Sequence, residues 1–152
     1  TVRKRVPHAR IDGVLIQERV TGGIEMIAGL SRQAPFGHVV VAGSGGVMVE
    51  LVRDSSLAIV PVDGPRAHTL VENTRAARLL DGFRGAAPSD RAAFEALIVR
   101  LSQIGVAYAC FIESIDLNPV AVLPKGEGIC VLDALIEVSA VSSKSIKTGA
   151  KP

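Results

Sequence analysis

Residues 112–137 read IESIDLNPVAVLPKGEGICVLDALIE, and this stretch predicts the fold more clearly than any other part of the chain. Val120–Leu123 and Ile129–Leu132 are apolar runs of the length of a β-strand, and the proline and glycines between them favour a short turn. We therefore expect two antiparallel strands joined by a turn, which form a β-hairpin.

The register of this hairpin decides which side chains share a face. If the turn centres on Lys125-Gly126, Asn118 lies opposite Asp133, and side chains so opposed are about 5 Å apart at Cβ. Asp116 falls on the same face, because side chains alternate along a strand. Three oxygen-bearing side chains on one face form a candidate Mg²⁺ site. The alternative is a turn-promoting Asn-Pro pair and an aspartate at the rim of the sheet, and a slip of one residue would move Asp133 to the other face.

Length and composition restrict the class of protein. The 152 residues fit one domain, and a hydrophobic content of 48% excludes a disordered chain. Aromatic residues make up 3% of the sequence, so aliphatic side chains must build the core, and an aromatic platform for nucleic acid is not expected. The net charge is +2, with basic residues gathered near both ends, which we interpret as solvated termini. No nucleic-acid partner is predicted.

Cysteine usage and the lengths of apolar runs indicate the compartment. Cys110 and Cys130 both lie in apolar, strand-like sequence, and we predict two buried free thiols in a reducing cytoplasm. No signal peptide is recognisable, and no apolar run approaches the roughly 20 residues that a membrane-spanning helix needs. The sequence therefore predicts a soluble cytoplasmic domain without a membrane partner.

The first part of the chain reads as a series of strands separated by turns and loops. A loop is expected at Ser31–Gly37, because this segment contains both proline and glycine. The predicted strands are Val14–Gln17, Ile24–Leu30, Val39–Ala42, Val47–Val52 and Leu57–Val60.

Two helices are predicted between these strands and the hairpin. Asp63 is a candidate N-cap for the first, whose imperfect apolar stripe continues to near Gly82. Ser89 or Asp90 caps the second, whose apolar residues recur at helical spacing and which Gly105 is expected to end.

Strands and helices are thus segregated along the chain. This order predicts an α+β fold, in which two helices pack on one face of a mostly antiparallel sheet. Residues 1–12 read as the end of a preceding element, residues 13–138 as the domain, and residues 139–152 as a flexible polar tail.

Several polar positions have two interpretations when only their spacing is considered. The run Gly43–Gly46 favours a tight turn, although glycines also let backbone N–H groups approach a phosphate. Glu18 and Glu25 flank the Gly22-Gly23 turn and read as solvated carboxylates, with contacts to a nucleotide as the alternative. Glu50 lies in an apolar run, where a solvent-facing and a functional position are equally expected.

Two long segments resemble a known family. They read GVLIQERVTGGIEMIAGLSRQAPFGHVVVAGSGGVMVELVRDSSLAIVPV and, much later, IDLNPVAVLPKGEGICVLDALI. This pattern, over about residues 11–138, resembles the ATP-grasp domain of NDP-forming acyl-CoA synthetases. These are the ADP-forming acetyl-CoA synthetases, related to the succinyl-CoA synthetase β subunit. The resemblance implies that residues 13–138 form the C-terminal subdomain of an ATP-grasp domain.

The resemblance also implies roles for single residues, and the first group concerns the nucleotide. The segment around the first predicted strand resembles the hinge that holds the adenine, and a following acidic residue is usual in ATP-grasp proteins. The implied nucleotide-binding residues are Gln17, Glu18, Val20 and Glu25.

The second group concerns the metal and the phosphate. Asn118 and Asp133 fall where the succinyl-CoA synthetase β subunit places its Mg²⁺ ligands, in agreement with the hairpin register. Gly45, Gly46 and Glu50 fall in the family's GGxxVE segment, and we assign them to contacts with the phosphohistidine or its phosphate.

The chain departs from the family pattern at three places. Arg32-Gln33-Ala34-Pro35 stands for the usual Arg-Asp-Pro before Phe-Gly, and His38 stands where proline is common. Ser114 occupies a position that is usually acidic.

The family's reaction interconverts acyl-CoA, phosphate and ADP with the free acid, CoA and ATP, by way of a phosphohistidine. In such an acid–thiol ligase this chain would supply the ATP/ADP and Mg²⁺ wall of the site. Its implied partners are the N-terminal ATP-grasp subdomain and the CoA-binding and ligase domains of the same enzyme, and a homo-oligomer is a further assembly that the resemblance allows. We expect the isolated chain to be inactive. The alternative is a non-catalytic nucleotide-sensing module, as in a degenerate synthetase region fused to an acyltransferase.

Overall fold

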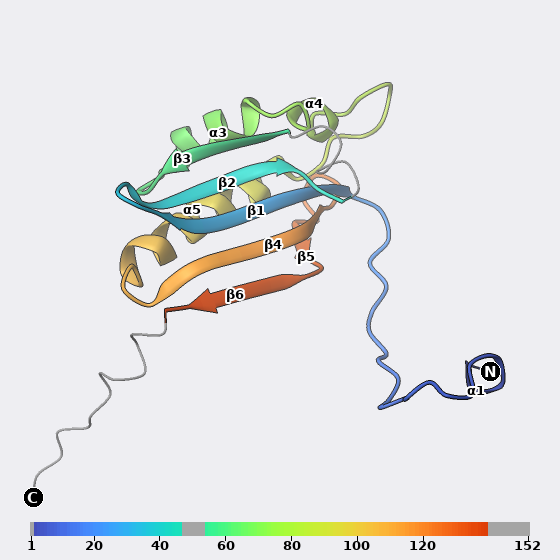
Figure 1. The fold of residues 1–152 in the computed structure, drawn as a ribbon. Coiled ribbons are helices and arrows are strands. Elements are labelled where there is room, and N and C mark those ends of the chain that lie inside the picture. The colour runs from blue at the N-terminus through green and yellow to red at the C-terminus, as the bar shows by residue number, and fades with distance from the viewer. Residues whose placement is uncertain (1, 47–53, 140–152) are drawn as a thin grey trace, which may run out of the picture.

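A six-stranded, wholly antiparallel sheet forms the centre of the molecule in the computed structural model, which describes residues 2–46 and 54–139 (Figure 1). The strands lie in the order β3-β2-β1-β4-β5, and β6 pairs with β4 beside β5. The strands are β1 (Ile24–Gln33), β2 (Gly37–Ser44), β3 (Ser55–Ile59), β4 (Ile112–Val122), β5 (Ile129–Val131) and β6 (Ala134–Val138).

Helices α3 (Gly64–Glu72) and α5 (Arg91–Ala107) cover one face of this sheet, and no described helix covers the other (Figure 1). Helix α5 packs against β1, β2 and β4, and helix α3 packs against β2, β3 and α5 (Figure 1). The helices are α1 (Val2–Arg5), α3 (Gly64–Glu72), α4 (Ala77–Leu80) and α5 (Arg91–Ala107). The predicted α+β class with a mostly antiparallel sheet is therefore confirmed.

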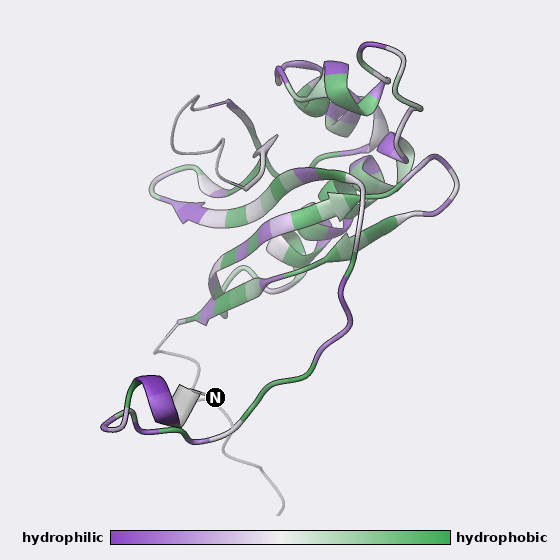
Figure 2. Cartoon of the chain, turned by 90° about the vertical axis from the view of Figure 1, so that its right-hand side faces the viewer, coloured by the Kyte–Doolittle hydropathy of each residue, from purple (hydrophilic) through white to green (hydrophobic). Residues whose placement is uncertain are grey.

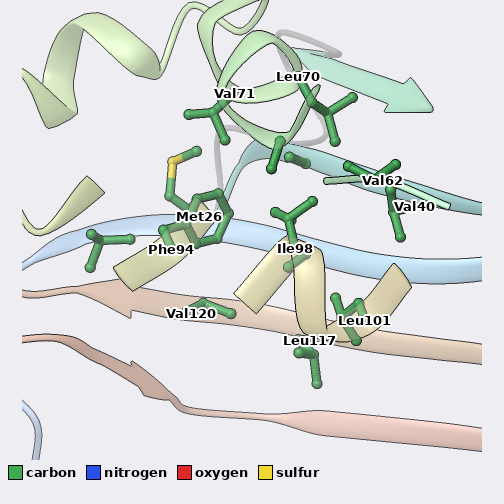
Figure 3. Packing of buried hydrophobic residues seen from close by; sticks show 14 of the residues in the cluster. Met26, Val40, Val62, Leu70, Val71, Phe94, Ile98, Leu101, Leu117 and Val120 are labelled. Atoms are coloured by element: carbon green, nitrogen blue, oxygen red, sulfur yellow. The ribbon is translucent and has the colours of Figure 1, made fainter. Parts of the chain in front are cut away.

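Aliphatic side chains build the core, as the scarcity of aromatic residues predicts. On β1, every second residue from Met26 to Leu30 is buried, and these side chains meet the inner face of α5 (Figure 3). Phe94, Ile98 and Leu101 of α5 are likewise buried, at the spacing of one helical face. The inward-facing side chains of β1 and the apolar face of α5 thus pack against one another and form one core.

Both predicted helix starts are confirmed. The side chain of Asp63 accepts a hydrogen bond from the Arg66 N–H at 3.0 Å, and that of Asp90 accepts one from the Ala93 N–H at 3.2 Å. Each carboxylate satisfies an N–H that has no partner within its own helix.

Both predicted helix ends are wrong. The first helix stops at Glu72 and a separate turn, α4, follows, because Asp54 accepts hydrogen bonds from the Arg75 and Ala76 N–H groups and bends the chain there. The second helix continues past Gly105 to Ala107. Gly105 is buried within it, and a Cβ atom at this position would lie 2.7 Å from Cδ1 of Leu30, so the glycine permits close packing.

Strand β1 and strand β3 extend beyond their predicted limits. The expected loop at Ser31–Gly37 is shorter, because β1 continues to Gln33 and pairs with β2 through the Gln33·Gly37 position. Strand β3 begins at Ser55, two residues before the predicted start. The predicted strand Val47–Val52 lies outside the described residues.

The predicted strand Val14–Gln17 is absent. Residues 6–23 contain no helix or strand and lead away from the sheet (Figure 1). Val14, Leu15 and Ile16 are 86%, 84% and 90% exposed, and they form an apolar segment on this arm (Figure 2). A strand requires a neighbour for its backbone hydrogen bonds, and no described segment lies beside this one.

The cysteines differ in part from the prediction. Both are free thiols, but Cys110 is exposed and Cys130 is half-buried, so neither belongs to the core. Among the described residues, no helix combines the length and the apolar character that crossing a membrane would require.

Candidate functional site

The open face of the sheet carries the polar residues of the hairpin, in the predicted register. The ladder pairs Ala121 with Cys130 and Leu117 with Ala134, and the Asn118 N–H donates a 3.2 Å hydrogen bond to the Asp133 carbonyl between them. Asn118 and Asp133 therefore lie directly opposite one another, as predicted.

A β-bulge gives Asn118 its place on the open face. Between Leu117 and Val120 the register of β4 against β1 shifts, so two residues of β4 lie opposite Ile27 alone. Leu117 and Val120 are both buried against the helices, whereas Asp116 and Asn118 are exposed. Because of the bulge, the strand keeps Leu117 and Val120 in the core on both sides of Asn118 while the Asn118 side chain stays on the open face.

Asp90 fixes the turn of the hairpin to the start of α5. While its Oδ1 caps the helix, its Oδ2 accepts hydrogen bonds from the Gly126 and Gly128 N–H groups at 3.1 and 2.9 Å. Hydrogen bonds from the Gly128 and Ala93 N–H groups are the main reasons why the pKa of Asp90 lies below its ordinary value. One carboxylate thereby holds the turn that sets the register of Asn118 and Asp133.

Glu25 lies against the Gly45-Gly46 turn. The Gly45 N–H donates a 2.8 Å hydrogen bond to the Glu25 carbonyl, and Gly46 adopts a φ of 62°. A Cβ atom on Gly46 would collide with the Glu25 carboxylate, so this side chain lies directly over the glycine. The structure thus brings together a residue that the resemblance assigns to the nucleotide and two that it assigns to the phosphate.

A second carboxylate secures the base of that turn. Asp54 accepts a hydrogen bond from the Ser44 hydroxyl, in addition to those from the Arg75 and Ala76 N–H groups. Burial alone would raise the pKa of Asp54, but the three hydrogen bonds outweigh it and lower the pKa below its ordinary value. Asp54 therefore joins the end of β2 to the turn between α3 and α4.

The other predicted site residues are placed differently. Gln17 and Glu18 are exposed on the N-terminal arm, and no hydrogen bond or ion pair links either to the sheet within the described ranges. Val20 is half-buried, nearer the start of β1. Glu50 lies outside the described residues.

Sequence reasoning missed the anchoring roles of Asp54 and Asp90. The N-cap position of Asp90 is visible in the sequence, but its bond to Gly128 spans 38 residues. The bond from Asp54 to Arg75 spans 21 residues. Neither separation leaves a local pattern that could reveal the contact.

The donor set on the open face fits a hard cation that retains other ligands. No group of three or more His, Cys, Asp or Glu side chains suited to a metal ion occurs in the part of the chain that the structure describes. Asn118 and Asp133 offer one amide oxygen and one carboxylate. Mg²⁺ typically takes one or two carboxylates and completes its shell with water and substrate phosphates, so a two-residue set is compatible with it.

A shallow hollow lies beside this pair on the same face. It has a volume of about 240 Å³ and lies over β1, β2 and β4. Its lining includes Ile27, Gly29, Val41, Ser114 and Asp116. An apolar floor next to a carboxylate can accept a flat ring at one end and polar groups at the other.

Comparison with known proteins gives consistent matches. The family model of the ATP-grasp domain matches residues 1–138. An ADP-forming acetate–CoA ligase I of Archaeoglobus fulgidus is 41% identical over 128 residues, which cover 84% of this chain and 18% of that protein. The β subunit of ADP-forming acetate–CoA ligase II of Pyrococcus furiosus is 37% identical over 134 residues, which cover 88% of this chain and 57% of the subunit.

Solved structures give the same picture. Dinucleotide-forming acetyl-coenzyme A synthetase 1 of Ca. Korarchaeum cryptofilum, in complex with coenzyme A and Mg-AMPPCP, is 41% identical with a TM-score of 0.74. The match covers 79% of this chain and 55% of that one. In a second complex, with coenzyme A, Ca-AMPCP and HgCl+, the identity is 42%, the TM-score is 0.76 and the coverage is 91% and 59%. This chain therefore spans less than three fifths of each of these relatives.

Proposed function

Because this chain belongs to the ATP-grasp domain family, we propose that it supplies the ATP/ADP and Mg²⁺ wall of an NDP-forming acyl-CoA synthetase. The whole enzyme would transfer a phosphoryl group between the nucleotide and a phosphohistidine, and would interconvert acyl-CoA, ADP and phosphate with acid, CoA and ATP. The observation that carries the proposal is the pairing of Asn118 with Asp133 on the face of the sheet that no described helix covers (Figure 1).

The arrangement of the open face supports a division of roles among its residues. Asn118 and Asp133 would hold the metal, with Asp116 in a supporting position on the same strand. Glu25 and the Gly45-Gly46 turn would contact the nucleotide and the phosphate on the side of β1 that pairs with β2. The positive charge of a bound Mg²⁺ would stabilise the negative charge of the phosphates during transfer. The chain's own contribution is therefore to orient the nucleotide, and Gln17, Glu18 and Val20 would hold the adenine from the N-terminal arm.

His38, which departs from the family pattern, and Arg32, which precedes the departure at Gln33-Ala34, both make contacts that hold the sheet together. His38 is buried, and its Nε2 lies 2.8 Å from the Ile112 carbonyl. Arg32 binds the Ala109 carbonyl and forms a 3.3 Å ion pair with Glu113. These residues tie β1 and β2 to the start of β4, so they maintain the sheet and leave the open face unchanged.

Magnesium–ADP titration tests the assignment of Asp133. We expect an Asp133→Ala variant to bind Mg-ADP at least about ten-fold more weakly than the unmodified chain, because it removes the one carboxylate of the proposed pair and Mg²⁺ is usually held by only one or two carboxylates. Isothermal titration calorimetry measures this, with and without Mg²⁺. Glu127→Ala, an exposed carboxylate at the turn of the same hairpin, is the matched control. Equal affinity of both variants for Mg-ADP would contradict the assignment.

The alternative, a non-catalytic nucleotide-sensing module, makes a different prediction for the complete protein. Ser114 at a usually acidic position is the observation that motivates it. Acyl-CoA-dependent formation of ATP by the parent protein would support the enzyme. Nucleotide binding without any turnover in that protein would support the sensor.

A further inference from the structure

Strand β6 forms an edge of the sheet that lacks the usual protection. No strand among residues 2–46 and 54–139 pairs with its outer side (Figure 1). Leu135, Ile136 and Val138 are 60%, 58% and 65% exposed. Edge strands are normally blocked by charged residues such as lysine, by proline or by a bulge. Strand β6 reads ALIEV, without lysine or proline, and the one register shift in its ladder inserts the extra residue into β4, between Ile112 and Ser114. The only charged side chain of β6 is that of Glu137, and its carboxylate already accepts a 2.6 Å hydrogen bond from the Ser114 hydroxyl.

The backbone groups that face outward can be identified from the ladder. The Asp133 carbonyl accepts from the Asn118 N–H, and the Ser139 N–H donates to the Phe111 carbonyl at 2.8 Å, so the odd-numbered residues face β4. Alternate residues of a strand direct their N–H and C=O groups to opposite sides. Ala134, Ile136 and Val138 therefore face outward, and of their groups the Ala134 N–H is occupied by Oδ1 of Asp133.

The other edge of the sheet differs in this respect. At the end of β3, the Arg66 guanidinium donates to the carbonyls of Ile59, the last residue of the strand, and of Pro61. A cation across the edge blocks the approach of a further strand, because it occupies an acceptor and cannot itself accept a hydrogen bond. Arg66 thus obstructs one end of β3, whereas no cation in the described part of the chain lies across the outer side of β6.

We propose that β6 pairs with β6 of a second copy of this chain, antiparallel, about a two-fold axis through Ile136. In this register Ile136 lies opposite Ile136 of the other copy, and Ala134 lies opposite Val138. These are the outward-facing residues, so the pairing forms four backbone hydrogen bonds even while the Ala134 N–H stays bound to Asp133. Of the registers that pair outward-facing groups, this one alone uses all five residues of the strand.

The side chains are self-complementary in the same register. Ala134, Ile136 and Val138 lie on one face and meet their counterparts there, which forms an apolar row across the axis. On the other face Leu135 lies opposite Glu137, and the two Glu137 side chains are diagonal neighbours about 7 Å apart. The sheets of the two copies would join edge to edge, so the open face with Asn118 and Asp133 stays accessible.

A five-residue ladder is short, so the proposal is a concentration-dependent dimer. Stable interfaces usually bury at least about 1,200 Å² in total, and a single short strand pair buries less than that. Sedimentation velocity of the 152-residue chain should show the mass rising toward twice that of the monomer as the concentration increases. A monomer at every concentration overturns the proposal.

Paired edge variants identify the strand that is used. Ile136→Lys places a charge on the free edge and should remove the dimer, and the far-ultraviolet circular dichroism spectrum should be unchanged because Ile136 is exposed. Leu57→Lys, at an exposed position of the opposite edge strand, should leave the dimer intact. A dimer that survives Ile136→Lys, or that disappears in Leu57→Lys, overturns the proposal.

A disulfide tests the axis directly. In a Cys110→Ser, Cys130→Ser background, Ile136→Cys brings two thiols together across the axis. The Cα atoms of a hydrogen-bonded pair are about 5.5 Å apart, within the range of about 4.4–6.8 Å for disulfides. Mild oxidation should give a covalent dimer of the Ile136→Cys variant and none of the Leu57→Cys control on non-reducing gels. Failure of Ile136→Cys to crosslink overturns the register.

Discussion

Two adjacent glycines in the Gly45-Gly46 turn are required for different reasons. A Cβ atom on Gly45 would lie 2.7 Å from the backbone of Glu25 and of Met26, atoms that cannot move without shifting β1. On Gly46 it would meet only the mobile end of the Glu25 side chain, although the φ of 62° disfavours any other residue there. The first glycine therefore maintains the fold, and the second maintains the position of Glu25.

Alanine at each position should separate these roles. We expect Gly45→Ala to lower the free energy of unfolding by about 2–3 kcal/mol, as overpacking against fixed atoms does. Gly46→Ala should lower it by about 1–2 kcal/mol, the usual effect of a left-handed backbone conformation on a residue with a Cβ. Urea denaturation followed by circular dichroism measures both values. A larger loss for Gly46→Ala than for Gly45→Ala would contradict this ranking.

Asp54 makes the stability of the chain depend on pH in the acidic range. Because the folded state lowers its pKa, the unfolded state binds the proton more readily. This contribution is fully present above the ordinary pKa of about 3.9, and it is lost as the pH falls through the lower pKa of the folded state.

Urea denaturation at a series of pH values tests this dependence. Between neutral pH and pH of about 3 the unmodified chain should lose stability, and Asp54→Asn should lose less over the same window. Asp63→Asn is a suitable control, since this carboxylate caps a helix without joining two distant segments. Parallel pH profiles for the unmodified chain and Asp54→Asn would assign the acid sensitivity to other groups.

At the scale of the elements, the hairpin and helix α5 are held as one unit by Asp90. We expect Asp90→Ala to weaken the start of α5 and to free the turn, so that the Gly126 and Gly128 amides lose protection from hydrogen exchange. Amide exchange measured by nuclear magnetic resonance resolves both glycines.

The matched control is Asp63→Ala, which removes only the cap of α3. It should lower stability by about 1 kcal/mol without changing exchange at the turn. Unchanged protection at Gly126 and Gly128 in Asp90→Ala would show that the β-ladder alone fixes the turn.

The elements that the sequence predicted well are those whose pattern is local. The hairpin register follows from an alternation of period two and a glycine-rich turn, and the caps Asp63 and Asp90 immediately precede their helices. The predictions that failed depend on distant partners. Asp54 bends the chain after α3 through a hydrogen bond from a residue 21 positions away. Gly105 does not end its helix, because it allows close packing against Leu30. Val14–Gln17 has a strand-like pattern but no neighbouring strand among the described residues.

The site follows the same division. The Asn118·Asp133 pairing could be predicted, because both residues belong to one hairpin. The position of Glu25 over Gly46 could not, because it depends on how β1 and β2 end relative to one another.

At the scale of the whole molecule, the proposed function requires a second wall over the open face. Asn118 and Asp133 are exposed, and this chain spans 18% and 57% of the two acetate–CoA ligase relatives. We therefore expect the isolated chain to show no acyl-CoA synthetase turnover, as measured by coupled formation of ATP from acetyl-CoA, ADP and phosphate. Activity of the 152-residue chain alone would contradict this.

The charge of the sheet has a consequence for the order of binding. The six described strands contain one arginine and no lysine, and that arginine, Arg32, is engaged with carbonyls of the β4 end and with Glu113. Glu25, Asp116 and Asp133 give the open face negative charge. A bare nucleoside diphosphate would be repelled there. If the open face binds a nucleotide as proposed, we therefore expect it to bind the complex with a divalent cation more tightly than the bare nucleotide.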